Sequence, residues 1–176
     1  MAATPASCGF PMVVRKLMTW LLVAVLVLVV AVFAAAQAGL LAGKEPIDLG
    51  VVDGKLKPPS RTENSVSSQA GLYADHPMKA YAEIAPFKFT GESKTAIERI
   101  RRIVESTEGA RIVRANSAYL YAQFQTRWLK FVDDAEFFAD AGANVVHVRS
   151  ASRIGRRDFG VNRARIEAIR ARFAGQ

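Results

Sequence analysis

The chain has 176 residues, a formal net charge of +8 and a sequence isoelectric point near 10.0. This length is typical of one folded domain with a short additional segment. The single cysteine, Cys8, excludes a disulfide framework and a cysteine-rich metal site elsewhere in the chain.

The additional segment is an apolar stretch close to the N-terminus. No charged residue occurs between Leu17 and Gly43, and residues 17–36 are almost entirely apolar. A helix of about 20 residues spans roughly 30 Å, which is the thickness of the hydrocarbon core of a bilayer. We therefore expect a transmembrane anchor over residues 17–41.

Basic residues beside the apolar stretch predict its orientation. Arg15 and Lys16 directly precede it, and flanking basic residues tend to stay in the cytoplasm. Residues 1–16 would then be cytoplasmic, and the following domain would lie in the periplasm, held at a bacterial inner membrane by a single span. A cleaved signal peptide is the alternative, because the small residues at 34–36 resemble a cleavage site.

Residues 44–84 are expected to form an extended lead-in with little regular structure. The segment contains four prolines and a polar stretch. It also contains apolar residues, among them Val51 and Leu56, which would let it lie across the folded domain. The folded domain itself is expected over residues 85–176.

The spacing of apolar residues predicts an α+β fold for this domain. Alternating residues indicate strands, and an i, i+3, i+4 spacing indicates helices. Short loops between successive strands make them antiparallel. We expect a small antiparallel sheet of about five strands packed with two helices, behind the N-terminal span. In chain order, the predicted elements are a strand at 87–89, a helix at 93–106, strands at 111–115, 118–126, 130–139 and 145–152, and a final helix from residue 162.

Two further expectations concern individual side chains. Ser93 and Asn162 belong to residue types that cap helix N-termini, and each directly precedes a helical pattern. The aromatic residues between Tyr119 and Phe138, Trp128 included, are expected to belong to the core and not to a ligand site.

The most basic part of the chain lies between Arg149 and Arg172, where eight arginines occur with only two acidic residues. Positive side chains are unfavourable at a helix N-terminus, whose free N–H groups already attract anions. Arginines at such a place predict a site for a phosphate, a carboxylate or another anion. The alternative is that they pair with carboxylates, such as Asp158 and Glu167, on a solvated surface. The residues assigned to the candidate anion site are Arg149, Arg153, Asp158, Asn162, Arg163 and Arg165.

Other chemistry is less well supported. His76 and His147 are far apart and do not form a metal-binding pattern, and the sequence has no dinucleotide fingerprint or P-loop. The carboxylates of Asp133, Asp134 and Glu136 could serve acid–base catalysis, but an exposed strand edge or salt bridges to the arginines are the favoured roles. We therefore assign no catalytic residue, no metal and no cofactor.

Several motifs resemble those of one family. Residues 146–155 read Val-His-Val-Arg-Ser-Ala-Ser-Arg-Ile-Gly, and residues 158–170 read Asp-Phe-Gly-Val-Asn-Arg-Ala-Arg-Ile-Glu-Ala-Ile-Arg. With the shorter motifs at 49–56, 121–124 and 131–137, they resemble the family called domain of unknown function 1499. The resemblance covers about residues 49–173. It implies an envelope or organelle protein of bacteria or plants, and it implies no particular reaction.

The chain departs from the family pattern at two positions. Family members often read Pro-Cys-Pro and then Pro-Asn-Cys-Val-Ser-Ser, whereas Pro59 and Ser65 stand at the two cysteine positions here. The loss of both cysteines together implies that they form a dispensable pair, such as a disulfide in the lead-in. It argues against a cysteine-dependent reaction in this chain.

The sequence thus predicts an uncharacterised membrane-anchored domain outside the cytoplasm, for which a binding role is favoured over an enzymatic one. Its expected partners are the membrane and an anionic ligand, a lipid headgroup or an envelope protein. Nucleic acid is not expected outside the cytoplasm. The alternative is an envelope hydrolase that uses His147 or the acidic residues beside the arginines.

Overall fold

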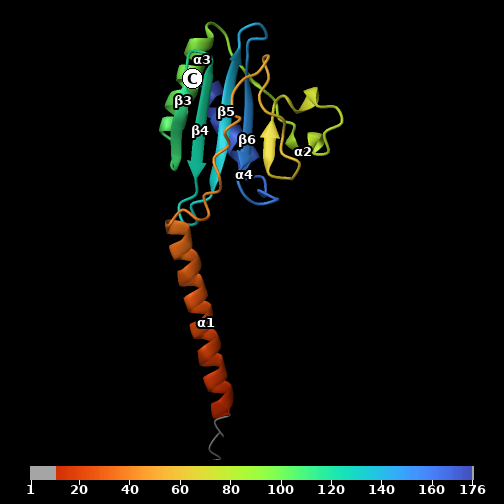
Figure 1. Ribbon diagram of the computed structural model, residues 1–176. Coiled ribbons are helices and arrows are strands. Elements are labelled where there is room, and N and C mark those ends of the chain that lie inside the picture. Colours follow the sequence, from red (N-terminus) through yellow and green to blue (C-terminus); the bar gives the residue numbers. More distant parts are fainter. Residues whose placement is uncertain (1–10, 176) are drawn as a thin grey trace, which may run out of the picture.

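The computed structural model describes residues 11–175 and consists of one long helix and one α+β domain (Figure 1). Helix α1, Met12–Gln37, extends away from the domain, and only Ala36 of its 26 residues is buried. It is long and apolar enough to cross a membrane or to act as a signal sequence. Cys8 and most of the expected cytoplasmic segment lie outside the described residues.

The domain is built on a six-stranded antiparallel sheet with the order β1-β6-β5-β4-β3, in which β2 also pairs with β6. The long strands occur where the alternating residues predicted them. The strands are β1 Ser65–Ser67, β2 Phe87–Lys88, β3 Ala110–Ala115, β4 Tyr119–Gln125, β5 Val132–Asp140 and β6 Val145–Ser152. The predicted α+β fold with an N-terminal helix is therefore confirmed.

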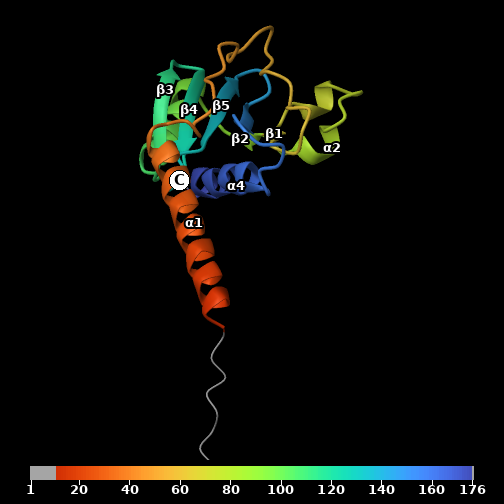
Figure 2. The ribbon, with the colours of Figure 1, turned by 60° about the horizontal axis from the view of Figure 1, so that its bottom comes forward.

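Two helices cover one face of the sheet. Helix α3, Ser93–Glu105, packs on β3, β4 and β5, and helix α4, Val161–Ala174, packs on β6 and on α3. Figure 2 shows α4 lying beneath the strands, across one face of the sheet. Apolar residues of both helices and of the sheet form the main core between these layers, including Ile97, Ile100, Leu120, Phe137, Val148 and Ile169.

The lead-in covers the other face of the sheet, as Figure 1 shows for its orange part. Leu56 is buried in a second small core with Tyr119 and Tyr121 of β4. The lead-in is more structured than expected, because it contributes β1, the short 3-10 helix η1, Ala70–Leu72, and the single-turn helix α2, Lys79–Ala82.

Three expectations about side chains were wrong. The N-cap of α3 is Glu92, and the hydroxyl of Ser93 is buried without a hydrogen-bond partner among the described residues. Asn162 lies inside α4, whose N-cap is Gly160 in a left-handed conformation with φ 82°. Trp128 is 64% exposed and does not belong to the core, because it lies in the loop between β4 and β5.

Candidate functional site

The sheet divides the arginines of the basic stretch into two groups. Side chains alternate between the faces of a strand, so Arg149 of β6 points toward the lead-in while Ser150 points toward α4. Arg153 follows β6 and joins the lead-in side through its bond to Asp134. Arg163 and Arg165 are carried by α4 on the opposite side. The four guanidinium groups therefore have different surroundings.

Arg149 and Glu136 are cross-strand neighbours beneath the lead-in. Glu136 is fully buried, and its Oε1 accepts hydrogen bonds from the Tyr119 hydroxyl at 2.7 Å and from the Gly50 N–H at 2.8 Å. Arg149 is 5% exposed, donates to the carbonyl of Pro58, and lies 3.8 Å from Glu136 Oε2. Burial raises the pKa of Glu136 and lowers that of Arg149, while their mutual attraction opposes both shifts. This buried pair joins the lead-in to the sheet.

Arg153 forms a two-point salt bridge with Asp134. Its Nε donates to Oδ2 at 2.9 Å and its Nη2 donates to Oδ1 at 2.8 Å. The hydroxyl of Tyr121 also donates to Asp134, and burial raises the pKa of Tyr121 to about 12. The hydrogen bond to Asp134 raises the pKa of Arg153, so this guanidinium is charged and already paired.

Asp158 and Asn162 form a buried polar cluster at the start of α4. Asp158 accepts hydrogen bonds from the Tyr81 hydroxyl at 2.6 Å and from the backbone N–H groups of Gly160 and Asn162. Burial alone would raise the pKa of Asp158, but these hydrogen bonds outweigh it and lower the pKa overall. The amide of Asn162 bonds to Ser152, and its carbonyl oxygen bonds to Ser150. Asp158 therefore caps α4, and Asn162 fastens the helix to β6.

The remaining two arginines of the candidate site also have internal partners. Arg163 donates to the backbone carbonyls of Tyr81 and Glu83, and Arg165 donates to Asp133 at 2.7 Å. The salt bridges predicted for the acidic residues of β5 are thus confirmed. The arginines assigned to the anion site do not meet around one open site, because each is held by a different partner.

His147 lies on the lead-in side of β6, where Ser68 and Asp140 approach it from opposite directions. Its Nδ1 is 3.2 Å from the Ser68 hydroxyl, and its Nε2 is 3.9 Å from Asp140 Oδ2. Burial lowers the pKa of His147, although the charge of Asp140 opposes this shift, so the imidazole is neutral at pH 7. Ser68 Oγ also accepts the N–H of Val148 at 2.9 Å, which ties the hydroxyl to the backbone of β6.

No metal centre accompanies these groups in the part of the chain that the structure describes. Within residues 11–175, no three His, Cys, Asp or Glu side chains are arranged to hold a metal ion. His76 instead accepts a hydrogen bond from the N–H of Met78 two residues later.

A different surface stands out at the end of the domain next to α1. We call it the α1-proximal end, and it consists of the β4–β5 loop, residues 126–131, and the β6–α4 loop with the first residue of α4, residues 153–161. Gln37, the last residue of α1, donates to the carbonyl of Trp128 at 3.0 Å. Gly43 packs on the β6–α4 loop so closely that a Cβ there would lie 2.9 Å from Ile154 Cγ2. The chain that leaves α1 therefore contacts both loops.

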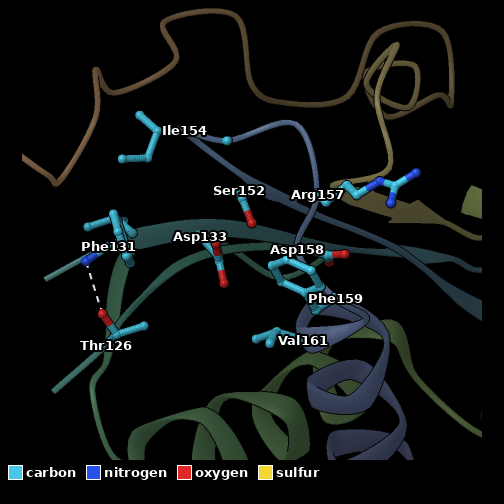
Figure 3. Close-up of a pocket in the computed structure, with 11 residues that line it drawn as sticks. Thr126, Phe131, Asp133, Ser152, Ile154, Arg157, Asp158, Phe159 and Val161 are labelled. Atoms are coloured by element: carbon cyan, nitrogen blue, oxygen red, sulfur yellow. Dashed lines mark hydrogen bonds between the residues drawn. The ribbon is translucent and has the colours of Figure 1, made fainter. Parts of the chain in front are cut away.

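A cavity of about 390 Å³ opens between these two loops. In Figure 3, Thr126 and Phe131 lie on one side of it, Phe159 lies on the other, and Asp133 and Ser152 lie between them. Most of its wall is apolar. Such a cavity is of the size that ligand sites in proteins have.

The sequence interpretation missed this surface for two reasons. Trp128 was counted with the aromatic residues of neighbouring strands, and Phe159 was read only as part of a family motif. The available signal was the local sequence Thr-Arg-Trp-Leu-Lys at 126–130, in which apolar and basic residues are mixed between two strands. That composition is typical of a membrane interface.

Comparison with known proteins places the chain in one family. The model of the family described as protein of unknown function (DUF1499) matches residues 55–173, which is most of the domain, and the chain belongs to that family. No curated protein and no solved structure matches the chain.

Proposed function

We propose that this member of the family is a membrane-anchored, non-enzymatic module whose α1-proximal end rests on the membrane surface and binds anionic lipid headgroups. Helix α1 supports the anchor, because its 26 residues form a helix about 39 Å long whose apolar side chains have almost no protein neighbours. A helix of this composition without packing partners is more stable in lipid than in water.

The observation that carries the proposal is the mixture of exposed aromatic and basic residues beside the end of α1. Trp128 and Phe159 are 64% and 91% exposed. Arg127, whose guanidinium lies over the Trp128 ring, and Arg156 are also exposed. Tryptophan is enriched at membrane interfaces, and each nearby cation contributes about 1 kcal/mol of attraction to an anionic surface. Arg15 and Lys16 lie at the other end of α1 and would stay in the cytoplasm. The domain would then face the periplasm of a bacterium.

The anchor and the cleaved signal peptide give different mature proteins. A retained anchor leaves the intact chain in the membrane fraction after extraction with alkaline carbonate. A signal peptidase that cuts after Ala36 would release a domain that begins at Gln37 and is extracted. Intact-mass measurement of the protein in the carbonate-resistant pellet and in the extract separates the two, and a mass that starts at Gln37 would rule out the anchor.

The contact with the membrane surface can be measured because the chain has only two tryptophans, Trp20 in α1 and Trp128. In the full-length Trp20→Phe variant, reconstituted in vesicles, we expect lipids brominated near the headgroup to quench Trp128. The Trp128→Phe variant is the control, in which deep bromines should quench Trp20. If an aqueous quencher reaches Trp128 freely and brominated lipids do not affect it, the domain does not rest on the membrane.

Charge selectivity is tested with the same fluorescence. Brominated phosphatidylglycerol should quench Trp128 more strongly than brominated phosphatidylcholine, because the nearby cations attract the anionic lipid. Replacing Arg127, Lys130 and Arg156 by Gln should remove this preference. The matched control replaces Lys55, Lys88 and Lys94, which are exposed and lie outside the α1-proximal end, and should retain it. Equal quenching by both lipids in the parent protein would refute headgroup selectivity.

A hydrolase is the second candidate, favoured by the arrangement of Ser68, His147 and Asp140 described above. Histidine can activate a serine when the two are within hydrogen-bond reach. The contacts of Ser68 with Val148 oppose this role, because its hydroxyl can donate its proton to the Val148 carbonyl at 3.4 Å instead of to His147. A fluorophosphonate probe should leave the protein unlabelled, whereas labelling that is lost in Ser68→Ala would establish the hydrolase.

A further inference from the structure

The cavity at the α1-proximal end has an apolar rim and a polar floor (Figure 3). Phe131, Ile154, Phe159 and Val161 contribute to the rim. The rim lies where the chain leaves α1, since Gln37 bonds to Trp128 and Gly43 packs against Ile154. A molecule that enters the cavity from a membrane crossed by α1 would therefore meet hydrocarbon side chains first.

The polar groups at the floor are already satisfied by the protein. Asp133 accepts a hydrogen bond from Arg165 at 2.7 Å, and Ser152 Oγ accepts one from the amide of Asn162 at 3.0 Å. Asp158, which also lines the cavity, is engaged in capping α4. Ligand specificity normally comes from a few polar groups that point into a pocket without protein partners. Since these groups have partners, the cavity favours an apolar occupant.

Phe159 has an unusual conformation for its position at the rim. Its φ is 52°, in the left-handed region that bulky residues avoid, and its side chain is 91% exposed. Exposure of the ring to water is unfavourable, and so is the left-handed backbone conformation that a bulky residue must adopt here. Backbone strain of this kind is concentrated at ligand sites. An apolar ligand in the cavity or the acyl region of a membrane would cover the ring.

Two arginines stand beside the apolar rim. Arg156 is exposed and has no salt-bridge partner among residues 11–175. Arg157 contributes to the cavity wall, but its guanidinium points away from the cavity (Figure 3) and bonds to Glu63 at 2.8 Å. Both arginines line the neighbouring surface pocket. Guanidinium groups bind phosphate through two parallel hydrogen bonds. The cavity thus offers a space for hydrocarbon, and the two cations lie on the surface that adjoins it, an arrangement that matches the two parts of an anionic phospholipid.

We propose that this cavity binds one acyl chain of an anionic phospholipid, with the lipid phosphate at Arg156 and Arg157. This inference rests on the proposed function, because the lipid must come from the membrane surface on which the α1-proximal end lies. It goes further in that the domain takes up part of a lipid molecule instead of only touching its headgroup.

The test uses the full-length protein in vesicles of phosphatidylcholine and phosphatidylglycerol. One preparation contains phosphatidylglycerol with a photoreactive diazirine at the end of one acyl chain, and a second contains phosphatidylcholine with the same chain. We expect the first probe to label peptides from the β4–β5 and β6–α4 loops in addition to α1, as mapped by mass spectrometry. Labelling confined to α1 would overturn the inference. Equal labelling by the two lipids would overturn the assignment of the phosphate to Arg156 and Arg157.

Variants distinguish binding in the cavity from binding to the surface around it. Val161→Trp fills the cavity and should lower chain labelling of the loops about tenfold, since overfilling a packed site makes binding unfavourable. Val52→Trp is the matched control, because Val52 is an exposed valine of the lead-in that does not line the cavity, and it should leave labelling unchanged. Replacing Arg156 or Arg157 by Gln should weaken the preference for phosphatidylglycerol about fivefold for each arginine. Unchanged labelling in Val161→Trp would show that the chain does not occupy the cavity.

A third probe, with the diazirine on the lipid headgroup, distinguishes this inference from the proposed function. Loop labelling by the headgroup probe without loop labelling by the chain probe would retain the surface contact and exclude the acyl chain. If neither probe labels the loops, both the binding of an acyl chain and the contact with the membrane surface are excluded.

Discussion

The backbone N–H of Gly50 donates a hydrogen bond to Oε1 of Glu136 at 2.8 Å, across a sequence separation of 86 residues. Glu136 thereby holds the lead-in against the sheet with a fully buried carboxylate, whose nearest cation is Arg149 at 3.8 Å. Gly50 has φ 139°, a conformation that other residues rarely adopt, so the contact depends on glycine.

Glu136→Ala should destabilise the domain by about 3–5 kcal/mol, because it leaves the buried charge of Arg149 without its partner. It also removes the acceptor for Gly50, so trypsin should cut the lead-in near Lys55 faster than in the parent protein. Urea unfolding and timed proteolysis measure the two effects. Glu108→Ala, at an exposed position, is the control. An equal response of both variants would mean that Glu136 does not hold the lead-in.

Asp158→Ala should lower the stability at pH 7 by about 2 kcal/mol, because two backbone N–H groups at the start of α4 lose their acceptor. The pKa of Asp158 is lowered in the folded state, so its contribution is complete above the unfolded pKa of about 4 and is lost as the pH falls through the folded value. Urea titrations at pH 7 and at pH 3 should therefore show a smaller difference between parent and variant in acid. A difference that does not change with pH would contradict the capping role.

The sequence predicted the long strands because the two faces of a strand carry different residue types. In β4, Leu120 and Ala122 face the helices and Tyr119 and Tyr121 face the lead-in, so the alternation is visible in the residue types. β1 has no such signal, since all three of its residues, Ser-Val-Ser, are buried. Its place beside β6 is set by pairing with a strand more than 80 residues later.

The candidate anion site was less predictable, because the three-dimensional fold decides which arginine pairs with which carboxylate. The sequence shows arginines near acidic residues, but the cross-strand register determines that Glu136 lies opposite Arg149. The position of α4 determines that Arg165 reaches Asp133. Asn162 was expected to cap α4, yet Asp158 reaches forward over the turn and supplies the oxygen instead.

Gly109→Ala should be among the most damaging substitutions of a small residue. Gly109 has φ 74°, and a Cβ there would overlap the carbonyl oxygen of Gln125 on β4. We expect a loss of roughly 3 kcal/mol, from the left-handed conformation and the overlap together. Gly54→Ala is the matched control, with φ 72° and no atom within 4 Å, and should cost about 1 kcal/mol. If thermal unfolding gives the same loss of stability for both variants, β4 can move away from residue 109 without a cost in free energy.

Pro59→Cys combined with Ser65→Cys should form a disulfide that closes a short loop of the lead-in. The Ser60 N–H donates to Ser65 Oγ at 2.8 Å, so the side chain of residue 65 already lies against the backbone next to Pro59, and both positions are buried. These are the two positions at which the resemblance to the family implies cysteines. Closing a loop of this length should stabilise the domain by about 2 kcal/mol, and the gain should disappear on reduction.

Thiol counting under denaturing conditions checks the bond. The parent protein has one thiol, at Cys8, and the oxidised double variant should also show one, whereas Ser65→Cys alone should show two. Three thiols in the double variant after air oxidation would mean that the side chains of residues 59 and 65 point apart. The geometry that disulfides require, with Cα atoms less than about 7 Å apart, would then be absent from this part of the lead-in.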